Sequence, residues 1–150
     1  MNKTILLPLI LCFLLLGCHN TLYSAQHHQP LDQVTKIELL NSENDFDLII
    51  LYTLTESEIQ PFLEKLMTFA FKSNGPPPET CYGPLAVRLY YENGYSDVIG
   101  IDANWYLDPE GNRLGGYYWY HLKDVDDYYT LFSQYVDTDL LPRPDHARYK

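Results

Sequence analysis

Asp97, Asp102 and His121 are the residues that could carry acid–base chemistry in this chain. A general acid and a general base must both reach one reacting group. Asp97 and Asp102 lie five positions apart on one expected strand, so a regular strand turns them to opposite faces. His121 follows an aromatic run, where a histidine hydrogen-bonded at a strand end is the commoner role. The catalytic residues therefore stay unknown, and an enzyme is the least favoured hypothesis.

Metal ligands do not occur at the spacing of a zinc site or an EF-hand, and the chain has no P-loop or serine nucleophile elbow. The adjacent His27 and His28 could touch a metal ion, but two ligands on a flexible segment make a weak site. Four acidic residues could surround a cation, although helix capping and solubility account for them equally well: Glu110, Asp124, Asp126 and Asp127. We expect no metal and no cofactor.

Aromatic residues are the feature that folding explains least, with 14 Tyr and two Trp in the chain. Alternate residues of a strand face opposite ways, so only one set can pack under helices. Tyrosine and tryptophan on the other face suit a surface that binds a partner. The residues of this predicted binding site are Tyr90, Trp105, Tyr117 and Trp119. The alternative is that loops or the C-terminal tail cover that face.

The N-terminus has the order of an export signal. Lys3 precedes about a dozen apolar residues, Ile5 to Leu16, a run too short to span a bilayer. The next residues complete Leu15-Leu16-Gly17-Cys18, which resembles the bacterial lipobox. This resemblance implies cleavage before Cys18, a diacylglycerol thioether on its sulfur and acylation of its amine. Ordinary cleavage after Ala25 is the alternative, but Tyr23 fits its small-residue position poorly.

Lipid on Cys18 would hold the protein at the cell envelope, on the extracytoplasmic side of a bacterial membrane. Each buried CH₂ contributes about 0.8 kcal/mol, so two long chains anchor a small domain stably. Cys12 leaves with the signal peptide, which makes Cys81 the one thiol of the folded part. A structural thiol is the favoured interpretation of Cys81, and a nucleophile the alternative.

Composition limits the partners. The chain has 150 residues, 46% of them apolar, which suits a single domain. The formal charge of the chain is −10, and the chain lacks the basic face that binding to nucleic acid requires. An acidic domain is also repelled by anionic lipid and cell-wall polymers. We expect a protein partner that is neutral or basic, and the oligomeric state stays open.

Two strands and a helix are predicted in the first half of the domain. Val34 to Leu40 alternates apolar and polar residues, and Phe46 to Tyr52 has a continuous apolar run. Thr55 and Glu58 then fit a capping box for a helix of about 16 residues. Pro61 lies within this helix, where it removes a backbone donor and crowds the preceding turn.

A hairpin is the strongest local signal, with Asn93-Gly94 between Leu85 to Glu92 and Tyr95 to Asp102. Asn-Gly favours a two-residue type I′ turn, because both central residues then take positive φ. That turn pairs Leu89 with Val98 and Tyr91 with Ser96. One face would carry Val87, Leu89, Tyr91 and Val98, and the other Arg88, Tyr90, Asp97 and Ile99.

Short strands and a second helix complete the domain. Trp105 to Leu107 and the aromatic segment Tyr117 to His121 are expected strands, with Gly115-Gly116 as a break between them. Asp124 can cap a helix whose apolar residues recur at helical spacing as far as Val136.

The element order ββα-ββββ-α predicts an α+β fold, an antiparallel sheet of about five to six strands with two helices on one face. The expected core residues are Ile50, Leu63, Leu66, Val87, Leu89, Val98 and Phe132. The expected organisation is a signal peptide (1–17), the lipidated cysteine with a flexible tether (18–33), one domain (34–137) and an irregular tail (138–150).

The chain resembles small bacterial lipoproteins that combine a lipobox, a linker and one α+β domain. The corresponding features are Leu54 to Ile59 with Phe62 at the helix start, and Tyr90 to Gly94 at the hairpin. These motifs are structural, and the resemblance implies no activity. We therefore expect a non-enzymatic surface lipoprotein that binds a protein, as an accessory, inhibitor or immunity-like domain. A saccharide-binding domain, or a hydrolytic enzyme, is the alternative.

Overall fold

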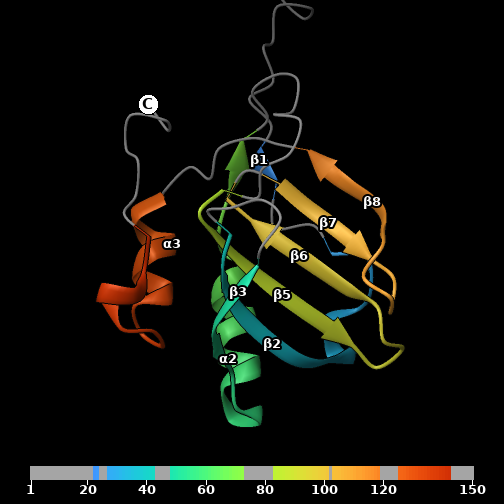
Figure 1. Cartoon of the computed structure of the whole chain (residues 1–150), viewed down its shortest axis with the longest axis horizontal. Coiled ribbons are helices and arrows are strands. Elements are labelled where there is room, and N and C mark those ends of the chain that lie inside the picture. The colour runs from blue at the N-terminus through green and yellow to red at the C-terminus, as the bar shows by residue number, and fades with distance from the viewer. Residues whose placement is uncertain are drawn as a thin grey trace, which may run out of the picture.

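The computed structural model describes residues 22–23, 27–42, 48–72, 83–101, 103–118 and 125–142. Within them the chain forms the expected α+β fold with the order ββα-ββββ-α (Figure 1). Several residues of the sequence predictions lie outside the described residues: Cys18, Cys81, Asp102, Trp119, His121 and Asp124.

Six strands form one antiparallel sheet in the order β3-β2-β5-β6-β7-β8. Their bounds are β2 Val34–Asn41, β3 Ile49–Thr53, β5 Leu85–Tyr91, β6 Ser96–Gly100, β7 Ala103–Leu107 and β8 Arg113–Tyr118. A separate pair joins β1 Leu22–Tyr23 to β4 Phe71–Lys72. Strands β3 and β8 are therefore the two edges of the main sheet.

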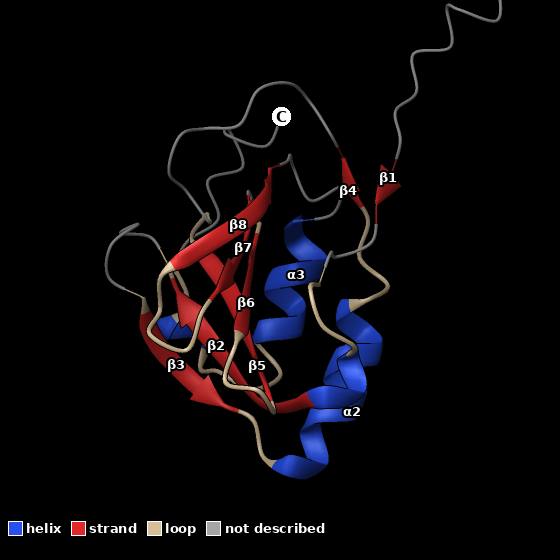
Figure 2. Ribbon diagram, turned by 90° about the vertical axis from the view of Figure 1, so that its right-hand side faces the viewer, coloured by secondary structure: helices blue, strands red, loops and turns tan. Residues whose placement is uncertain are grey.

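Two helices, α2 Glu56–Leu66 and α3 Val125–Phe132, lie on one side of this sheet (Figure 2). The Glu58 carboxylate accepts the Thr55 backbone N–H at 2.7 Å, which is the glutamate's part of the predicted capping box. Helix α2 contains Pro61 and has 11 residues, fewer than predicted. Helix α3 ends at Phe132, and hydrogen-bonded turns continue to Val136. None of the described helices is long and apolar enough to cross a membrane.

The core lies between the sheet and the helices, on what we call the helix face. A smaller apolar cluster occupies the opposite side, the outer face: Leu40, Ala86, Val98, Ala103, Trp105 and Leu107. Six of the seven predicted core residues are buried, but Ile50 is 55% exposed. That prediction was wrong because β3 is an edge strand with a bulge. The extra residue is Leu51 of β3, which lies opposite the step from Leu39 to Leu40 of β2, and Leu51 and Tyr52 pack against the core while Ile50 stays at the rim.

The hairpin between β5 and β6 differs from the predicted two-residue turn. Tyr91 donates its N–H to the Tyr95 carbonyl at 3.0 Å, so the loop has three residues, Glu92 to Gly94. Gly94, the last residue of the loop, takes a positive φ of 84°. The register therefore pairs Leu89 with Asp97 and Tyr90 with Ser96, one residue away from the prediction. The Asn-Gly pair fits both loops, because a type I turn followed by a left-handed glycine and a type I′ turn each accept Asn-Gly.

This one-residue shift exchanges the faces of β6. Asp97 and Ile99 turn to the helix face, and Val98 turns to the outer face, because side chains alternate along a strand. The loop from β7 to β8 has the same construction, with Gly111 at φ 87°. A Cβ on Gly94 would stand 3.3 Å from Pro109 Cγ, so the two loops lie side by side.

The last strand begins earlier than predicted. Strand β8 runs through Gly115 and Gly116, which were expected to break the chain, and its described part ends at Tyr118. The glycines pair with two large aromatic residues, Gly115 with Tyr106 and Gly116 with Trp105. An aromatic residue can pack across a glycine on the neighbouring strand, which offsets the weak strand preference of glycine.

Candidate functional site

Two clusters of polar and aromatic side chains occupy opposite faces of the sheet. The first surrounds Asp97, which is fully buried on the helix face. Its carboxylate accepts the Tyr91 hydroxyl at 2.5 Å and the His28 backbone N–H at 2.8 Å. The Nδ1 atom of His28 lies 2.6 Å from the other carboxylate oxygen. A buried carboxylate needs such partners, because leaving it without them costs several kcal/mol.

Aromatic rings complete this first cluster. The His28 imidazole stacks on Tyr106 with centroids 4.3 Å apart, and Tyr106 stacks on Tyr95 at 5.3 Å. The Gln29 side chain donates to the Tyr106 hydroxyl at 2.9 Å. Residues 27–30, within the segment expected to be a flexible tether, therefore pack against the sheet. A 3-10 helix, Leu31–Gln33, then leads into β2.

The Asp97 cluster contains a histidine that a carboxylate holds in place, as in many active sites. Here these contacts attach the N-terminal segment to the sheet. Burial, together with the Asp97 carboxylate, raises the pKa of Tyr91 well above its usual value, so the phenol stays a donor. The contacts join residues 28 and 97, which are 69 positions apart, and hold the N-terminal segment on the sheet. The sequence contains no signal for this pairing, and the predicted register placed Asp97 on the other face.

The second cluster lies on the outer face, around Tyr90 of β5. Lys36 Nζ is 4.7 Å from the centroid of the Tyr90 ring, and Arg88 Cζ is 4.5 Å from it. The Tyr90 hydroxyl donates to Glu38 at 2.7 Å, and Glu38 also pairs with Lys36 at 2.5 Å. Arg88 donates its Nε–H to the Ser96 hydroxyl at 3.1 Å. Two cations thus lie against one half-buried ring, and Lys36 also pairs with the buried Glu38 carboxylate.

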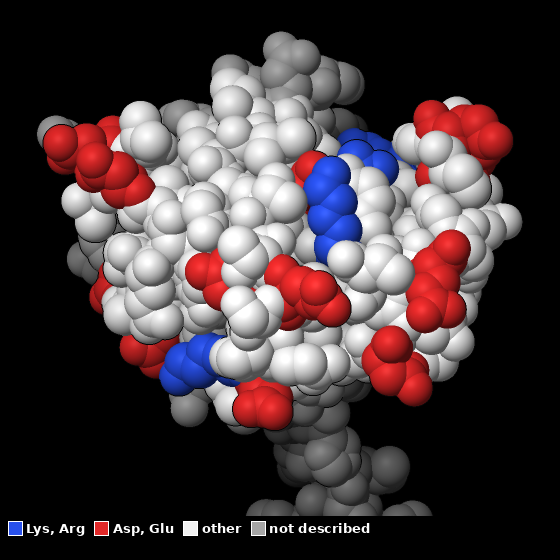
Figure 3. Space-filling model, turned by 90° about the horizontal axis from the view of Figure 1, so that it is seen from below, with Lys and Arg blue, Asp and Glu red and all other residues white. Residues whose placement is uncertain are grey.

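Charge is distributed unevenly over the described surface. Acidic side chains predominate at the end of the molecule shown in Figure 3, with lysine and arginine as narrow groups between them. Of the four cationic side chains that the structure describes, Lys36, Arg88 and Arg113 belong to the outer face of the sheet, and Lys65 belongs to α2. The outer face is therefore a positive, aromatic region of an acidic protein.

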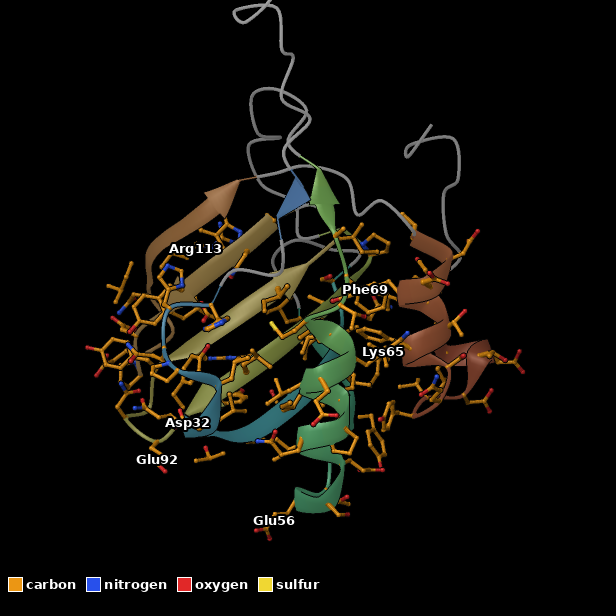
Figure 4. All side chains as sticks on the ribbon, turned by 180° about the vertical axis from the view of Figure 1, so that it is seen from behind. Asp32, Glu56, Lys65, Phe69, Glu92 and Arg113 are labelled. Carbon is orange, nitrogen blue, oxygen red and sulfur yellow. The ribbon has the colours of Figure 1, made fainter. Side chains whose placement is uncertain are left out.

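Of the four predicted binding residues, Tyr90 is the one at the centre of this outer-face cluster. It is half-buried, and burial with the bond to Glu38 raises its pKa to about 12. Trp105 also belongs to the outer face, but it is only 8% exposed, and the Arg113 guanidinium lies 4.4 Å from its ring (Figure 4 labels Arg113). Trp105 is thus a core residue of that face.

Of the remaining predicted site residues, Tyr117 lies on β8, three strands along the sheet from β5, which carries Tyr90. Tyr117 pairs with Asn104, one position along from the Trp105–Gly116 pair, and Trp119 lies outside the described residues. Lys36, Glu38 and Arg88 were not among the predicted site residues. The sequence does indicate that they share the polar side of the strands, since they alternate with apolar residues on β2 and β5.

No group of three or more histidine, cysteine, aspartate or glutamate residues in the described part of the chain could hold a metal ion. Comparison of the chain with known protein families, with curated proteins and with solved structures gives no match. Function is therefore inferred from the two clusters and the N-terminal sequence.

Proposed function

We propose that the protein is a lipoprotein of the bacterial cell envelope, anchored through lipid on Cys18, and that its domain binds another protein. The observation that carries this proposal is the Tyr90 cluster. A half-buried tyrosine in contact with two cations lies on the sheet face that neither described helix covers. Tyrosine and arginine, like tryptophan, are enriched among the residues that contribute most to protein–protein binding.

The anchor and the fold are compatible. Strand β1 begins at Leu22, four residues after Cys18, and four extended residues reach at most about 14 Å. A domain held so closely to lipid meets partners within the envelope. The overall charge of −10 favours a partner that is neutral or basic as a whole.

The alternatives receive less support from the same observations. A saccharide stacked on Trp105 needs an open indole face, but this ring is 8% exposed and Arg113 lies over it. A hydrolytic enzyme would need a group for the Asp97 and His28 pair to activate. The bonds of Asp97 instead connect the N-terminal segment to the hairpin.

Capture and direct binding test the protein-binding proposal. Full-length protein in neutral detergent is immobilised through a C-terminal tag and exposed to envelope extract. The captured protein is then purified, and its Kd is measured by calorimetry. Tyr90→Ala should weaken this binding at least about tenfold, which is about 1.4 kcal/mol.

Tyr52→Ala is the matched control, because Tyr52 is also a half-buried strand tyrosine but packs against the helix-face core. Circular dichroism establishes that both variants fold. Equal Kd values for the Tyr90→Ala variant and the unchanged protein would show that the outer face is not the interface.

Lipid attachment is tested separately by mass spectrometry of the membrane fraction. The unchanged protein should carry acyl chains and begin at residue 18. Cys18→Ser should remove the lipid mass and release the protein from the membrane. A lipid-modified Cys18→Ser protein would contradict the anchor.

A further inference from the structure

Arg88 of the outer face uses one of its five N–H donors in the hydrogen bond to Ser96. Its Nε–H bonds to Ser96, and its guanidinium plane lies over Tyr90. Glu38 is its register partner on β2, but Glu38 bonds to Lys36 and to the Tyr90 hydroxyl. Among the residues that the structure describes, no carboxylate lies within ion-pair distance of Arg88. A guanidinium has five N–H donors, so its terminal nitrogens can accept a planar anion.

Lys36 supplies a second cation at the same ring. Its side chain is 46% exposed, while that of the paired Glu38 is 4% exposed. The lysine, the arginine and the single glutamate leave the Tyr90 cluster with one positive charge in excess. Contact with the same ring limits the motion of both cations, which lowers the entropy lost when an anion binds.

We propose that Arg88 and Lys36, both of which lie against the Tyr90 ring, form a site for one acidic side chain of the protein partner. This inference rests on the proposed function and specifies the chemistry of the same face. The carboxylate would accept hydrogen bonds from the terminal nitrogens of Arg88, with Lys36 as a second, more mobile charge. Charge complementarity selects this occupant, because a cationic group would meet two cations there.

The surrounding acidic surface gives such a site selectivity. A partner rich in acidic residues is repelled by the overall charge of −10, whereas one isolated carboxylate can reach the Tyr90 cluster. The site therefore suits a neutral or basic protein that presents a single aspartate or glutamate at its interface. It fixes the orientation of that partner more than it adds affinity.

A short peptide tests the site without the natural partner. The probe is an N-acetylated, C-amidated peptide with one glutamate among glycine and serine residues, and the glutamine peptide is its control. Both are titrated into full-length, ¹⁵N-labelled protein in neutral detergent, and the Arg88 Nε–H resonance is followed by NMR. The glutamate peptide should shift this resonance saturably, the glutamine peptide should not, and added salt should weaken binding.

Two substitutions locate the effect. Arg88→Gln should reduce peptide affinity at least about tenfold when the Tyr90 ring resonances are followed instead. Lys65→Gln is the matched control, since Lys65 lies over Phe69 on the helix side, 5.8 Å from the ring centroid (Figure 4). If Arg88→Gln does not fold, Arg88→Lys keeps the charge but loses the fork, and it should still weaken binding.

Several results would overturn the inference. These are an unsaturable response, equal responses to the two peptides, equal affinity in the Arg88→Gln variant, or saturation by inorganic phosphate but not by the glutamate peptide. Failure of the proposed function looks different. If a purified partner loses affinity with Tyr90→Ala but not with Arg88→Gln, the binding face stands and the carboxylate site does not.

Discussion

Removal of one hydroxyl from Tyr91 tests the interpretation of the Asp97 cluster. In Tyr91→Phe the ring stays in place and the carboxylate still accepts the His28 backbone N–H at 2.8 Å. The loss is therefore one buried hydrogen bond of 2.5 Å to a charged group. Such bonds contribute about 1.5–3 kcal/mol, so we expect a loss of about 2 kcal/mol in the free energy of unfolding.

Urea unfolding followed by far-ultraviolet circular dichroism measures this loss. With a slope of about 2 kcal/mol/M, the midpoint should fall by about 1 M while the slope stays unchanged. Tyr52→Phe makes the same chemical change at a hydroxyl that lies 3.3 and 3.4 Å from the two Glu58 carboxylate oxygens. We expect it to cost less than about 0.5 kcal/mol, because those bonds are long. Equal losses in the two variants would refute the assignment of Asp97 as a buried, hydrogen-bonded carboxylate.

Further predictions concern the loops, the outer face and pH. Gly94→Ala should destabilise the protein more than Gly111→Ala. Both substitutions place alanine at a positive φ, which costs about 1–2 kcal/mol, but only Gly94→Ala adds a close contact with Pro109. Thermal unfolding would show this order, and the reverse order would contradict the packing of the two loops. Trp105→Ala should cost about 3–5 kcal/mol in urea unfolding, as expected for a core aromatic residue; a loss below about 1 kcal/mol would return Trp105 to the list of surface residues. Tyr90 should ionise near pH 12 in ultraviolet titration, and Glu38→Gln should lower that value. Because the folded chain keeps the Tyr90 proton between its usual pKa of 10.0 and about 12, the unfolded chain binds fewer protons there and stability should fall as pH rises through this window. Ionisation of all tyrosines near pH 10 in the folded protein would contradict the contact with Glu38.

The fold class could be predicted because it depends on local pattern. Alternating apolar residues, the Thr55 to Glu58 cap and the element order each restrict the chain within a few residues. The candidate site was predicted in part. Tyr90 was named, but its neighbours Lys36 and Glu38 come from β2, more than 50 positions away along the chain.

The wrong predictions share one physical origin: the same short sequence can adopt more than one backbone conformation, and its surroundings select one. Asn93-Gly94 fits a two-residue or a three-residue loop, and the choice moves Asp97 from one face of the sheet to the other. The pair Gly115-Gly116 predicts a break when it is considered alone. In the sheet the two glycines pair with Tyr106 and Trp105 and belong to a strand. Ile50 is apolar enough for a core, yet its strand is at the edge of the sheet.

Composition and local pattern set the acidic charge, the cysteine at the end of an export-like segment, the order of elements and most of the helix-face core. These properties depend on composition and on residues near each other in the chain. The contacts between distant side chains depend instead on how the strands assemble into the sheet. This assembly brought His28 to Asp97 across 69 positions, and it placed Lys36 and Arg88 on one tyrosine ring. Strand pairing and burial set those contacts, and both are properties of the assembled sheet.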